Sequence, residues 1–313
     1  MKLAFFVDPL ETFNIKKDSS YAMMREAARR GHTIHVFHQE DMVLKHGVVF
    51  AACTEIFLTG KTPSWYEPGQ SIMSDLGEYD AVMMRKDPPF DMEYYYATQL
   101  LEIAERRGAR IVNRPGSLRN WNEKLAIAKF PEFTPPTLVA RSGEAIRDFL
   151  EIHGDIIVKP LDGMGGAGVF RMKQHDPNIG VIIETATLYG KKTVMAQRFV
   201  PEIEAGDKRI LVVGGEAAPF CLARIPKQGE TRGNLASGGK GVARPLSDRD
   251  LEIAKAIGPI LEADGILLAG LDVIGDYLTE INVTSPTCMQ EIHDQTGYDV
   301  AKMMVDLLER RCA

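Results

Sequence analysis

The sequence predicts an α/β protein in which a parallel α/β domain precedes a larger part built from strand pairs. Up to residue 113, buried strand patterns alternate with amphipathic helix patterns, which is typical of a parallel sheet. After residue 122, several strand patterns instead follow one another across glycine-containing turns, as hairpin strands do. We therefore expect a first domain that ends near residue 122.

The elements of the first domain follow from hydrophobic periodicity and from helix start and stop signals. They are a strand at 2–8, a helix at 21–30 ended by Gly31, strands at 33–37 and 80–84, a helix at 94–107 and a strand at 110–113. Ligands of open α/β sheets bind beyond the carboxyl ends of the strands. Asp18 and Ser19 lie in such a position, and either of them also suits a helix cap. Arg85 lies there too, and we interpret it either as a clamp for a substrate carboxylate or as one partner of a surface salt bridge.

The second part begins near Trp121, and prolines at 131, 135 and 136 mark a linker. The predicted elements are a helix at 145–152, strands at 155–160, 169–172, 192–200, 207–213 and 219–225, a helix at 247–261, strands at 267–274 and 278–283, and a helix at 299–311. Composition is that of a globular protein, with 313 residues, 45% hydrophobic content and a net charge of -6. That sign disfavours a general nucleic-acid binder.

The four cysteines are far apart, and the N-terminal apolar run is too short for a signal peptide. These features predict a cytoplasmic protein. His32, His35 and His38 are expected to be structural, since a strand sends His35 away from its neighbours and no acid or thiol completes a metal site.

Residues 163–168 read GMGGAG and formally match the dinucleotide motif G-x-G-x-x-G. That motif requires a helix directly after the glycines, whereas here a strand pattern follows. We therefore expect a flexible hairpin whose Gly163, Gly165 and Gly166 offer backbone N–H groups to phosphates, as in the glycine loop of protein kinases. Lys159, on the strand before it, is placed to neutralise phosphate charge.

Further anion and nucleotide contacts are predicted on the strands that follow. The strand at 192–200 ends at a connector where an adenine ring can bond to backbone groups, and one of Glu202, Glu204 and Asp207 can hold a ribose hydroxyl. Arg209 and Arg224 fall on neighbouring strands, and two arginines inside a sheet need an anion from substrate or protein. Residues 229–241, GETRGNLASGGKG, show no strand or helix pattern and suit a substrate lid better than a passive loop.

A hairpin near the C-terminus carries the predicted metal site. A three-residue loop at 275–277 with a bulge aligns Asp272 with Glu280, whereas a two-residue turn places Asp272 opposite Thr279 and sends Glu280 to the other face. Asn282 lies on the same face as Glu280. Two carboxylates and an amide oxygen suit Mg²⁺, which leaves its other positions to water and phosphates. The sequence shows no nucleophile with an adjacent base. The glycine hairpin, the basic residues and the metal site together favour phosphoryl transfer from Mg-ATP.

The order of Lys124, Lys159 with GMGGAG, Asp272 and then Glu280-Ile281-Asn282 resembles the ATP-grasp superfamily, whose members join a carboxylate to an amine or thiol. More narrowly, the chain resembles bacterial glutathione synthetases from end to end. The strings that carry this resemblance are NIKKDSS, MRKDPPFD, KPLDGMGG, ARIP, ETRGNLASGG and LTEINVTSPT.

The resemblance implies an N-terminal domain at 1–122 and an α+β ATP-grasp unit. That unit has a central subdomain at 123–197 with the glycine hairpin and a C-terminal subdomain at 198–313 with the metal site and a mobile loop at 226–241. It also implies ATP-dependent ligation of γ-glutamylcysteine and glycine through an acyl phosphate, Mg²⁺ or alternatively Mn²⁺ as the metal, and a homotetramer.

The same resemblance assigns roles to matching positions. Lys124 and Lys159 would bind phosphates, 197–200 with Gln197, Phe199 and Val200 would surround adenine, and Asp207 would bind ribose. Arg209 and Arg224 would hold the reacting groups, with Arg232 on the closing loop. Asp272, Glu280 and Asn282 would bind the metal. Asp18, Ser19, Arg85, Thr284 and Ser285 would hold γ-glutamylcysteine.

Two other functions stay open at this point. One is another ATP-grasp ligase, such as a D-alanine ligase or a glutamate ligase acting on a protein tail, which would share the ATP and metal residues. The other is a module that binds ATP without turnover, which would predict loss of a metal ligand or of Arg224. Neither loss occurs in this sequence.

Overall fold

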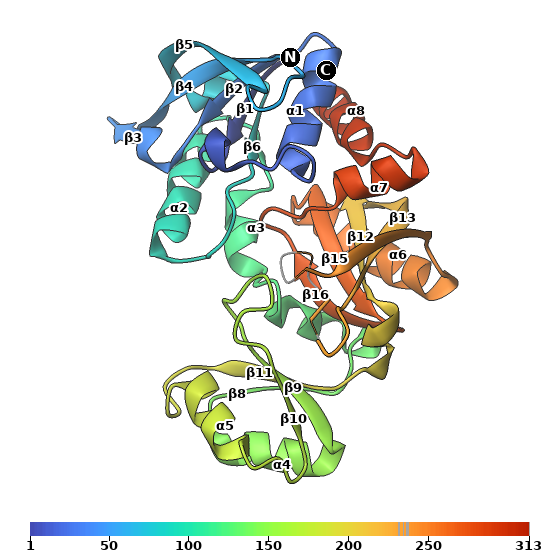
Figure 1. The fold of residues 1–313 in the computed structure, drawn as a ribbon. Coiled ribbons are helices and arrows are strands. Elements are labelled where there is room, and N and C mark those ends of the chain that lie inside the picture. The colour runs from blue at the N-terminus through green and yellow to red at the C-terminus, as the bar shows by residue number, and fades with distance from the viewer. Residues whose placement is uncertain (231, 234, 236–237, 313) are drawn as a thin grey trace.

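The fold contains three β-sheets that follow one another along the chain (Figure 1). A computed structural model describes residues 1–230, 232, 233, 235 and 238–312. The N-terminal and C-terminal sheets lie next to each other, and the central sheet with its two helices extends away from them. The N-terminus and C-terminus lie close together, because the last helix packs against the first.

The N-terminal sheet has the order β3-β4-β2-β1-β6-β7, with β5 paired to β4. The contacts β1–β2, β1–β6 and β6–β7 are parallel, as predicted. The pairs β2–β4, β3–β4 and β4–β5 are antiparallel. The parallel pairing of the predicted strands is therefore confirmed, and three strands between residues 42 and 75 that were not predicted extend the sheet with antiparallel pairs. The strands are β1 Lys2–Phe6, β2 Thr33–Phe37, β3 Met42–Lys45, β4 Val48–Leu58, β5 Tyr66–Asp75, β6 Ala81–Met84 and β7 Ile111–Val112.

The two longer helices of this domain begin at aspartate caps. Asp18 accepts a hydrogen bond from the Tyr21 N–H and starts α1, Ser19–Arg29. Asp91 accepts one from the Tyr94 N–H and starts α2, Met92–Arg106. These bonds satisfy amide groups that have no partner inside the helix. A short α3, Pro115–Asn120, leads out of the domain.

The central sheet is antiparallel, with the order β10-β9-β11-β8. Residues 161–169 join β9 to β10, so the predicted order of strand, glycine loop and strand is confirmed. Helices α4 and α5 cover one face of this sheet around a separate apolar core. The elements are β8 Thr137–Ala140, α4 Gly143–His153, β9 Asp155–Pro160, β10 Phe170–Lys173, α5 Ile179–Thr187 and β11 Val194–Arg198.

The C-terminal sheet is also antiparallel, with the order β14-β13-β12-β15-β16. Its elements are β12 Asp207–Val213, β13 Glu216–Ile225, β14 Lys240–Pro245, α6 Asp248–Ala263, β15 Leu268–Ile274, β16 Tyr277–Asn282, α7 Met289–Thr296 and α8 Val300–Cys312. Strand β14 corrects the expectation of an irregular segment up to residue 241, since its first two residues already pair with β13. Short 3-10 helices lie at Leu10–Thr12, Gln39–Asp41, Leu76–Glu78, Leu125–Lys129, Pro131–Phe133 and Pro201–Ala205.

Candidate active site

The hairpin of β15 and β16 places Asp272 directly opposite Glu280, as predicted. The reason differs from the one expected. The turn has two residues, Gly275 and Asp276, because Ile274 pairs with Tyr277. A bulge between Asp272 and Val273 then shifts the register by one residue, so that both carboxylates lie on one face. Asn282 follows on that face opposite Gly270, whose carbonyl accepts a hydrogen bond from the Asn282 Nδ2.

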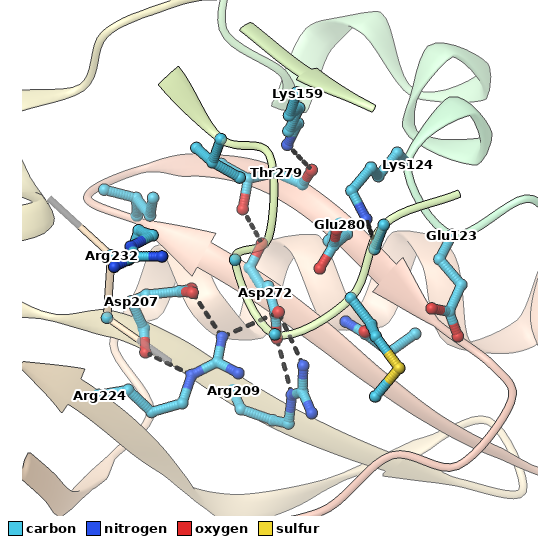
Figure 2. A pocket seen from close by; sticks show the side chains of 18 of the residues that line it. Glu123, Lys124, Lys159, Asp207, Arg209, Arg224, Arg232, Asp272, Thr279 and Glu280 are labelled. Carbon is cyan, nitrogen blue, oxygen red and sulfur yellow. Dashed lines mark hydrogen bonds and ion pairs between the residues drawn. The ribbon is translucent and has the colours of Figure 1, made fainter. Parts of the chain in front are cut away.

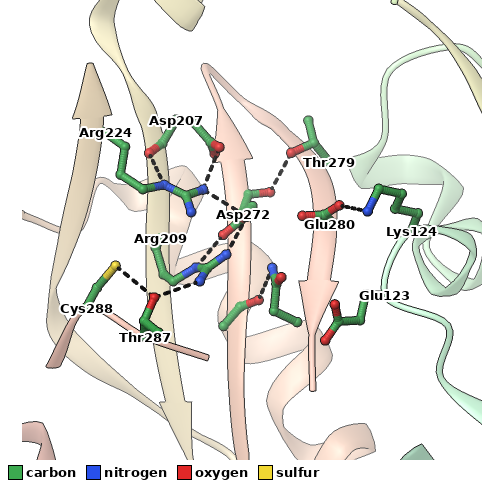
Figure 3. Close-up of polar contacts among 12 residues, drawn as sticks. Glu123, Lys124, Asp207, Arg209, Arg224, Asp272, Thr279, Glu280, Thr287 and Cys288 are labelled. Atoms are coloured by element: carbon green, nitrogen blue, oxygen red, sulfur yellow. Dashed lines mark hydrogen bonds and ion pairs between the residues drawn. The ribbon is translucent and has the colours of Figure 1, made fainter. Parts of the chain in front are cut away.

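Asp272 is the buried carboxylate that Arg209 and Arg224 share (Figure 3). Arg209 binds it with two hydrogen bonds of 2.8 Å, from Nε to Oδ1 and from Nη2 to Oδ2. Arg224 Nη2 lies 2.8 Å from the same Oδ2. Burial alone would raise the pKa of Asp272, but the two guanidinium groups hold this pKa well below its usual range. The anion that the two arginines require is therefore supplied by the protein.

Asp207, at the start of β12, is the second carboxylate of this network. Its Oδ2 lies 2.5 Å from Arg224 Nη2, and its register partner on β13 is also Arg224. Burial raises the pKa of Asp207 to about 6, against the opposing effect of Arg224. Its Oδ1 is buried, and no described residue donates a hydrogen bond to it. A buried acceptor of this kind suits a ligand hydroxyl.

Two lysines reach the acidic hairpin from the central part of the chain (Figure 2). Lys124 Nζ lies 2.7 Å from Glu280 Oε1 and donates a 2.5 Å hydrogen bond to the Gly163 carbonyl. Lys159 Nζ donates to the Thr279 carbonyl at 3.1 Å. Burial lowers the pKa of Lys159, whereas Glu280 outweighs burial and raises the pKa of Lys124. Both lysines therefore contact the hairpin of β15 and β16.

The glycine loop between β9 and β10 has a backbone that most side chains would disturb. Gly165 and Gly166 have positive φ angles of 62° and 82°, in the left-handed region that glycine adopts without penalty. A Cβ atom at Gly163 would lie 2.7 Å from Pro160 Cγ. The loop therefore requires glycine at several positions to follow this path beside Lys124.

The segment expected around adenine lies on β11 and just after it. Gln197 is buried and donates from Nε2 to Thr137 Oγ1 at 3.0 Å. The guanidinium of Arg171 lies 3.5 Å from the centre of the Phe199 ring. Gln197, Phe199 and Val200 line the same cavity as the acidic hairpin.

Arg232 also lines this cavity, and it pairs with Glu230 through an Nη2 to Oε2 contact of 2.6 Å. The predicted mobile loop at 226–241 includes Thr231, Asn234, Ala236 and Ser237, which lie outside the described residues. Its closing over substrate stays a prediction.

Glu123 is a residue of this site that the sequence analysis missed. Its Oε1 accepts hydrogen bonds from the N–H groups of Val283 and Thr284 and from the Thr284 hydroxyl, at 2.8 to 3.0 Å. Its carbonyl accepts one from the Ile281 N–H. Glu123 therefore holds the chain directly after Asn282. In the sequence, Asn122-Glu123-Lys124 resembles the start of a helix. No local pattern indicates that Glu123 contacts the distant residues Val283 and Thr284.

Of the five residues expected to hold γ-glutamylcysteine, Thr284 and Ser285 line the cavity. The Ser285 hydroxyl also donates to Asp87 Oδ1. Asp18 caps α1, and Ser19 Oγ accepts a hydrogen bond from the Met289 N–H. Asp18, Ser19 and Arg85 lie outside the lining that the described residues form, so their substrate role stays a prediction.

Arg85 is not in a surface salt bridge, since only 5% of it is exposed. It donates from Nε to Ser20 Oγ and from Nη2 to the Pro286 carbonyl, both at 3.0 Å. Its Nη1 has no partner among the described residues. Burial lowers the pKa of this arginine. Through its hydrogen bond to the Pro286 carbonyl, Arg85 holds the chain directly after Ser285.

All of the predicted site residues except Asp18, Ser19 and Arg85 line one cavity of about 360 Å³. It lies between the central sheet and the C-terminal sheet. Figure 2 shows Lys124 and Lys159 directed toward the hairpin of β15 and β16, and the Asp272 carboxylate facing Arg209 and Arg224. No group of three His, Cys, Asp or Glu side chains arranged for a metal ion occurs among the described residues. The third predicted ligand is an amide, and the all-oxygen set fits Mg²⁺.

Other sequence expectations concern residues away from this cavity. His32 contacts Glu309, and His38 contacts the Val7 carbonyl, so these two have structural partners. The four cysteines are free. None of the helices in the described part of the chain has the length and apolar character needed to cross a membrane.

Similarity to known proteins covers the whole chain. A glutathione synthetase of Nitrosomonas europaea is 58% identical over 100% of this chain and 99% of its own length. One of Vibrio parahaemolyticus is 56% identical over 99% and 98%. Among solved structures, D-cycloserine synthetase DcsG has a TM-score of 0.68 at 15% identity, covering 99% of both chains. ATP-grasp ligase PsnB, complexed with precursor peptide PsnA2 and AMPPNP, has a TM-score of 0.64 at 17% identity and covers 99% and 98%.

The two solved structures share the ATP-grasp fold with this chain at low identity. The prokaryotic glutathione synthetase N-terminal domain matches residues 1–119, and the prokaryotic glutathione synthetase ATP-grasp domain matches residues 123–297. The chain therefore belongs to the prokaryotic glutathione synthetase family.

Proposed function

We propose that this chain joins γ-glutamylcysteine to glycine, forming glutathione and converting ATP to ADP and phosphate. The γ-glutamylcysteine carboxylate attacks the γ-phosphorus of ATP, and the glycine amine then displaces phosphate from the resulting acyl phosphate. The observation that carries this proposal is the meeting of Asp272 and Glu280 with cations from three separate segments in one cavity. Such an arrangement suits a reaction in which charge neutralisation and alignment supply the rate.

Phosphate binding is assigned to Lys124, Lys159 and the glycine loop. Both lysines are buried beside Glu280, where a triphosphate can use their charge without competition from bulk water. The backbone N–H groups of Gly163, Gly165 and Gly166 are the proposed partners of phosphate oxygens.

The metal is proposed to be Mg²⁺, with Mn²⁺ as the alternative ion, held by Asp272, Glu280 and Asn282. When bound, such an ion neutralises charge on the transferring phosphoryl group. In this structure Asp272 is paired with two arginines and Glu280 with Lys124. We infer that these cations keep the buried carboxylates charged and in place.

The nucleoside part of ATP is assigned to the other end of the cavity. Gln197, Phe199 and Val200 line it where an adenine ring would meet strand β11. Asp207 Oδ1 is the proposed acceptor for a ribose hydroxyl, because this buried oxygen has no other partner among the described residues.

Phosphoryl transfer is assigned to Arg209 and Arg224, with Arg232 as a third cation. The first two are rigidly held, because each binds Asp272. Preorganised charges of this kind stabilise a transition state without reorganisation. Arg232, which lines the cavity from the loop beyond β13, is proposed to contact the transferring group.

γ-Glutamylcysteine is assigned to the cavity wall after β16, where Thr284 and Ser285 are exposed to it. We place Asp18, Ser19 and Arg85 behind this wall, since Ser19 bonds to Met289 and Arg85 to Pro286. Their proposed role is to position residues 284–289.

We further propose a homotetramer. Large apolar side chains are exposed on the antiparallel strands of the N-terminal sheet and on the start of α2, and exposed patches of this kind often mark subunit interfaces. They are Val43, Leu44, Phe57, Ile72, Met73, Met92, Tyr95 and Tyr96. Analytical ultracentrifugation tests this, and a monomer at micromolar concentration would contradict it.

The test of the activity is phosphate release with Mg-ATP, γ-glutamylcysteine and glycine, omitting each in turn. We expect release only with all three. Equal release with D-alanine alone, or with a glutamate-ended peptide, would instead favour another ATP-grasp ligase. Binding of ATP with no release would indicate a module without turnover.

A further inference from the structure

The side chain of Gln290 connects the C-terminal part of the chain to the N-terminal domain. Gln290 lies in the first turn of α7, shortly after Ser285 on the cavity wall assigned to γ-glutamylcysteine. Only 5% of it is exposed. Its partners lie in loop 14–18, the turn directly before α1, which is 272 to 275 residues away in the sequence. Figure 1 shows α7 beside α1.

Both hydrogens of the Gln290 side-chain amide are used in this contact. Nε2 donates one hydrogen bond to the Ile15 carbonyl and another, of 2.9 Å, to the Asp18 carbonyl. Because a side-chain amide carries two N–H groups, these two bonds saturate the nitrogen. Oε1 accepts a longer hydrogen bond of 3.4 Å from Arg25 Nη1. The contact with loop 14–18 therefore depends on donation by the nitrogen.

Loop 14–18 is a single turn. The N–H groups of Lys17 and Asp18 both donate to the Asn14 carbonyl, at 2.8 and 2.9 Å, and the Asp18 side chain then caps α1. Holding such a turn in one conformation costs conformational entropy. The two hydrogen bonds from Gln290 offset part of this cost.

Other hydrogen bonds join the same two regions. The Met289 N–H donates to Ser19 Oγ at 3.2 Å, and Arg85 links α1 to the chain directly after Ser285. These bonds hold the start of α1, whereas Gln290 holds the loop before it. The loop, the start of α1 and the wall after β16 are thus connected, although they come from opposite ends of the chain.

We propose that Gln290 is a positioning residue for γ-glutamylcysteine, because its two amide hydrogens bind loop 14–18 to the wall after β16. This inference rests on the proposed function, which assigns Asp18 and Ser19 to that substrate. The contact requires an uncharged donor. A carboxylate of the same size would instead place its oxygens against the carbonyl oxygens of Ile15 and Asp18.

Hydrogen exchange in the substrate-free protein, followed by NMR, tests the contact itself. Gln290→Met keeps the length of the side chain but donates no hydrogen bond. In this variant the amides of Lys17 and Asp18 should exchange at least about tenfold faster than in wild type, while those of strand β1 stay unchanged. Exchange in loop 14–18 at the wild-type rate would show that Gln290 does not hold the loop.

Steady-state kinetics test the role in substrate binding. For Gln290→Met we expect KM for γ-glutamylcysteine to rise about tenfold, as for the loss of about one net hydrogen bond. Both kcat and KM for ATP should stay within about twofold of wild type. A fall in kcat with unchanged KM for γ-glutamylcysteine would contradict a positioning role. Faster loop exchange with unchanged kinetics would limit Gln290 to a structural contact.

Gln290→Glu separates donation to the loop from the contact with Arg25. The carboxylate keeps the size of the side chain and can pair with Arg25, but it repels the two loop carbonyls. We therefore expect KM for γ-glutamylcysteine to rise at least as much as in Gln290→Met. Kinetics of Gln290→Glu like those of wild type would mean that the contact with Arg25 is sufficient, and the proposal would be wrong.

Gln295→Met is the matched control on the same helix. Gln295 accepts a 2.9 Å hydrogen bond from the Ala243 N–H and donates one of 3.4 Å to the Gly241 carbonyl. Losing these bonds leaves loop 14–18 untouched, so KM for γ-glutamylcysteine should equal that of wild type. A rise as large as in Gln290→Met would assign the effect to α7 as a whole and overturn the proposal for Gln290.

These results separate this inference from the proposed function. If wild type releases no phosphate with the three substrates, the ligase function fails, whereas hydrogen exchange still decides whether Gln290 holds the loop. If wild type is active and Gln290→Met has wild-type KM for γ-glutamylcysteine, only the inference about Gln290 fails.

Discussion

Glu26 and Asp272 each bridge a pair of arginines, and the surroundings of these two carboxylates differ. Glu26 binds Arg29 and Arg30, which lie on or at the end of its own helix, and the Arg29 side chain is 66% exposed. Asp272 binds Arg209 and Arg224, which come from two strands and are buried beside a cavity. The first cluster is a local product of helical spacing. The second requires three strands in register, and its burial cost indicates a function in the cavity.

Asp272→Asn should produce the largest effect. Losing the carboxylate removes a proposed metal ligand and leaves Arg209 without its charged partner, so we expect phosphate release to fall at least about 1,000-fold. Glu26→Gln is the matched control, since it neutralises the equivalent bridge far from the cavity and should keep wild-type turnover. If Asp272→Asn keeps activity within tenfold of wild type, the burial of the Asp272 bridge has no role in function.

Arg224→Lys should have the next largest effect. Lysine keeps the charge but cannot contact Asp207 and Asp272 with a planar fork. We expect kcat to fall about 100-fold with a smaller change in KM for ATP, because the loss falls mainly on the transition state. Steady-state kinetics measure both values. A change confined to KM would assign Arg224 to substrate binding alone.

Arg85→Met tests a buried arginine that, unlike Arg209 and Arg224, has no carboxylate partner among the described residues. The change leaves Ser20 Oγ and the Pro286 carbonyl without their donor, so we expect unfolding free energy to fall by about 2 kcal/mol. Denaturant titration measures it. KM for γ-glutamylcysteine should also rise if Arg85 positions the wall at 284–289, whereas unchanged kinetics would limit Arg85 to a structural role.

Glu26→Gln should have the smallest effect, visible only in stability. Hydrogen bonds from Arg29 lower the pKa of Glu26 to about 2, from an ordinary value of 4.5. The resulting stabilisation is present above pH 4.5 and is lost as pH falls through about 2. With the exposure of Arg29 considered, we expect wild type to exceed the variant by about 1 to 2 kcal/mol at pH 7. The gap should narrow steadily below pH 4.5, and a gap independent of pH would contradict this account.

Much of the site could be predicted because its residues lie on strongly patterned strands. The two-residue period placed Glu280 and Asn282 on one face, and alternation placed Arg209 and Arg224 on adjacent strands. The loop length of the metal hairpin was wrong, because a bulge beside Asp272 leaves no distinct sequence signal. Strands β3 to β5 were also missed. The exposed faces of β3 and β5 weaken the hydrophobic pattern on which strand prediction depends, whereas β4 has an alternating pattern and was overlooked.

The sequence alone determined the secondary structure of most strands and helices, the presence of phosphate-binding and metal-binding residue types, and the family resemblance. These depend on local propensity, periodicity and short strings of residues. Only the tertiary structure decided that Asp272 is the shared anion of Arg209 and Arg224, that Lys124 reaches Glu280, and that Glu123 closes the strand end. Such pairings join segments up to 160 residues apart, and no local pattern records which distant charge will neutralise a buried one.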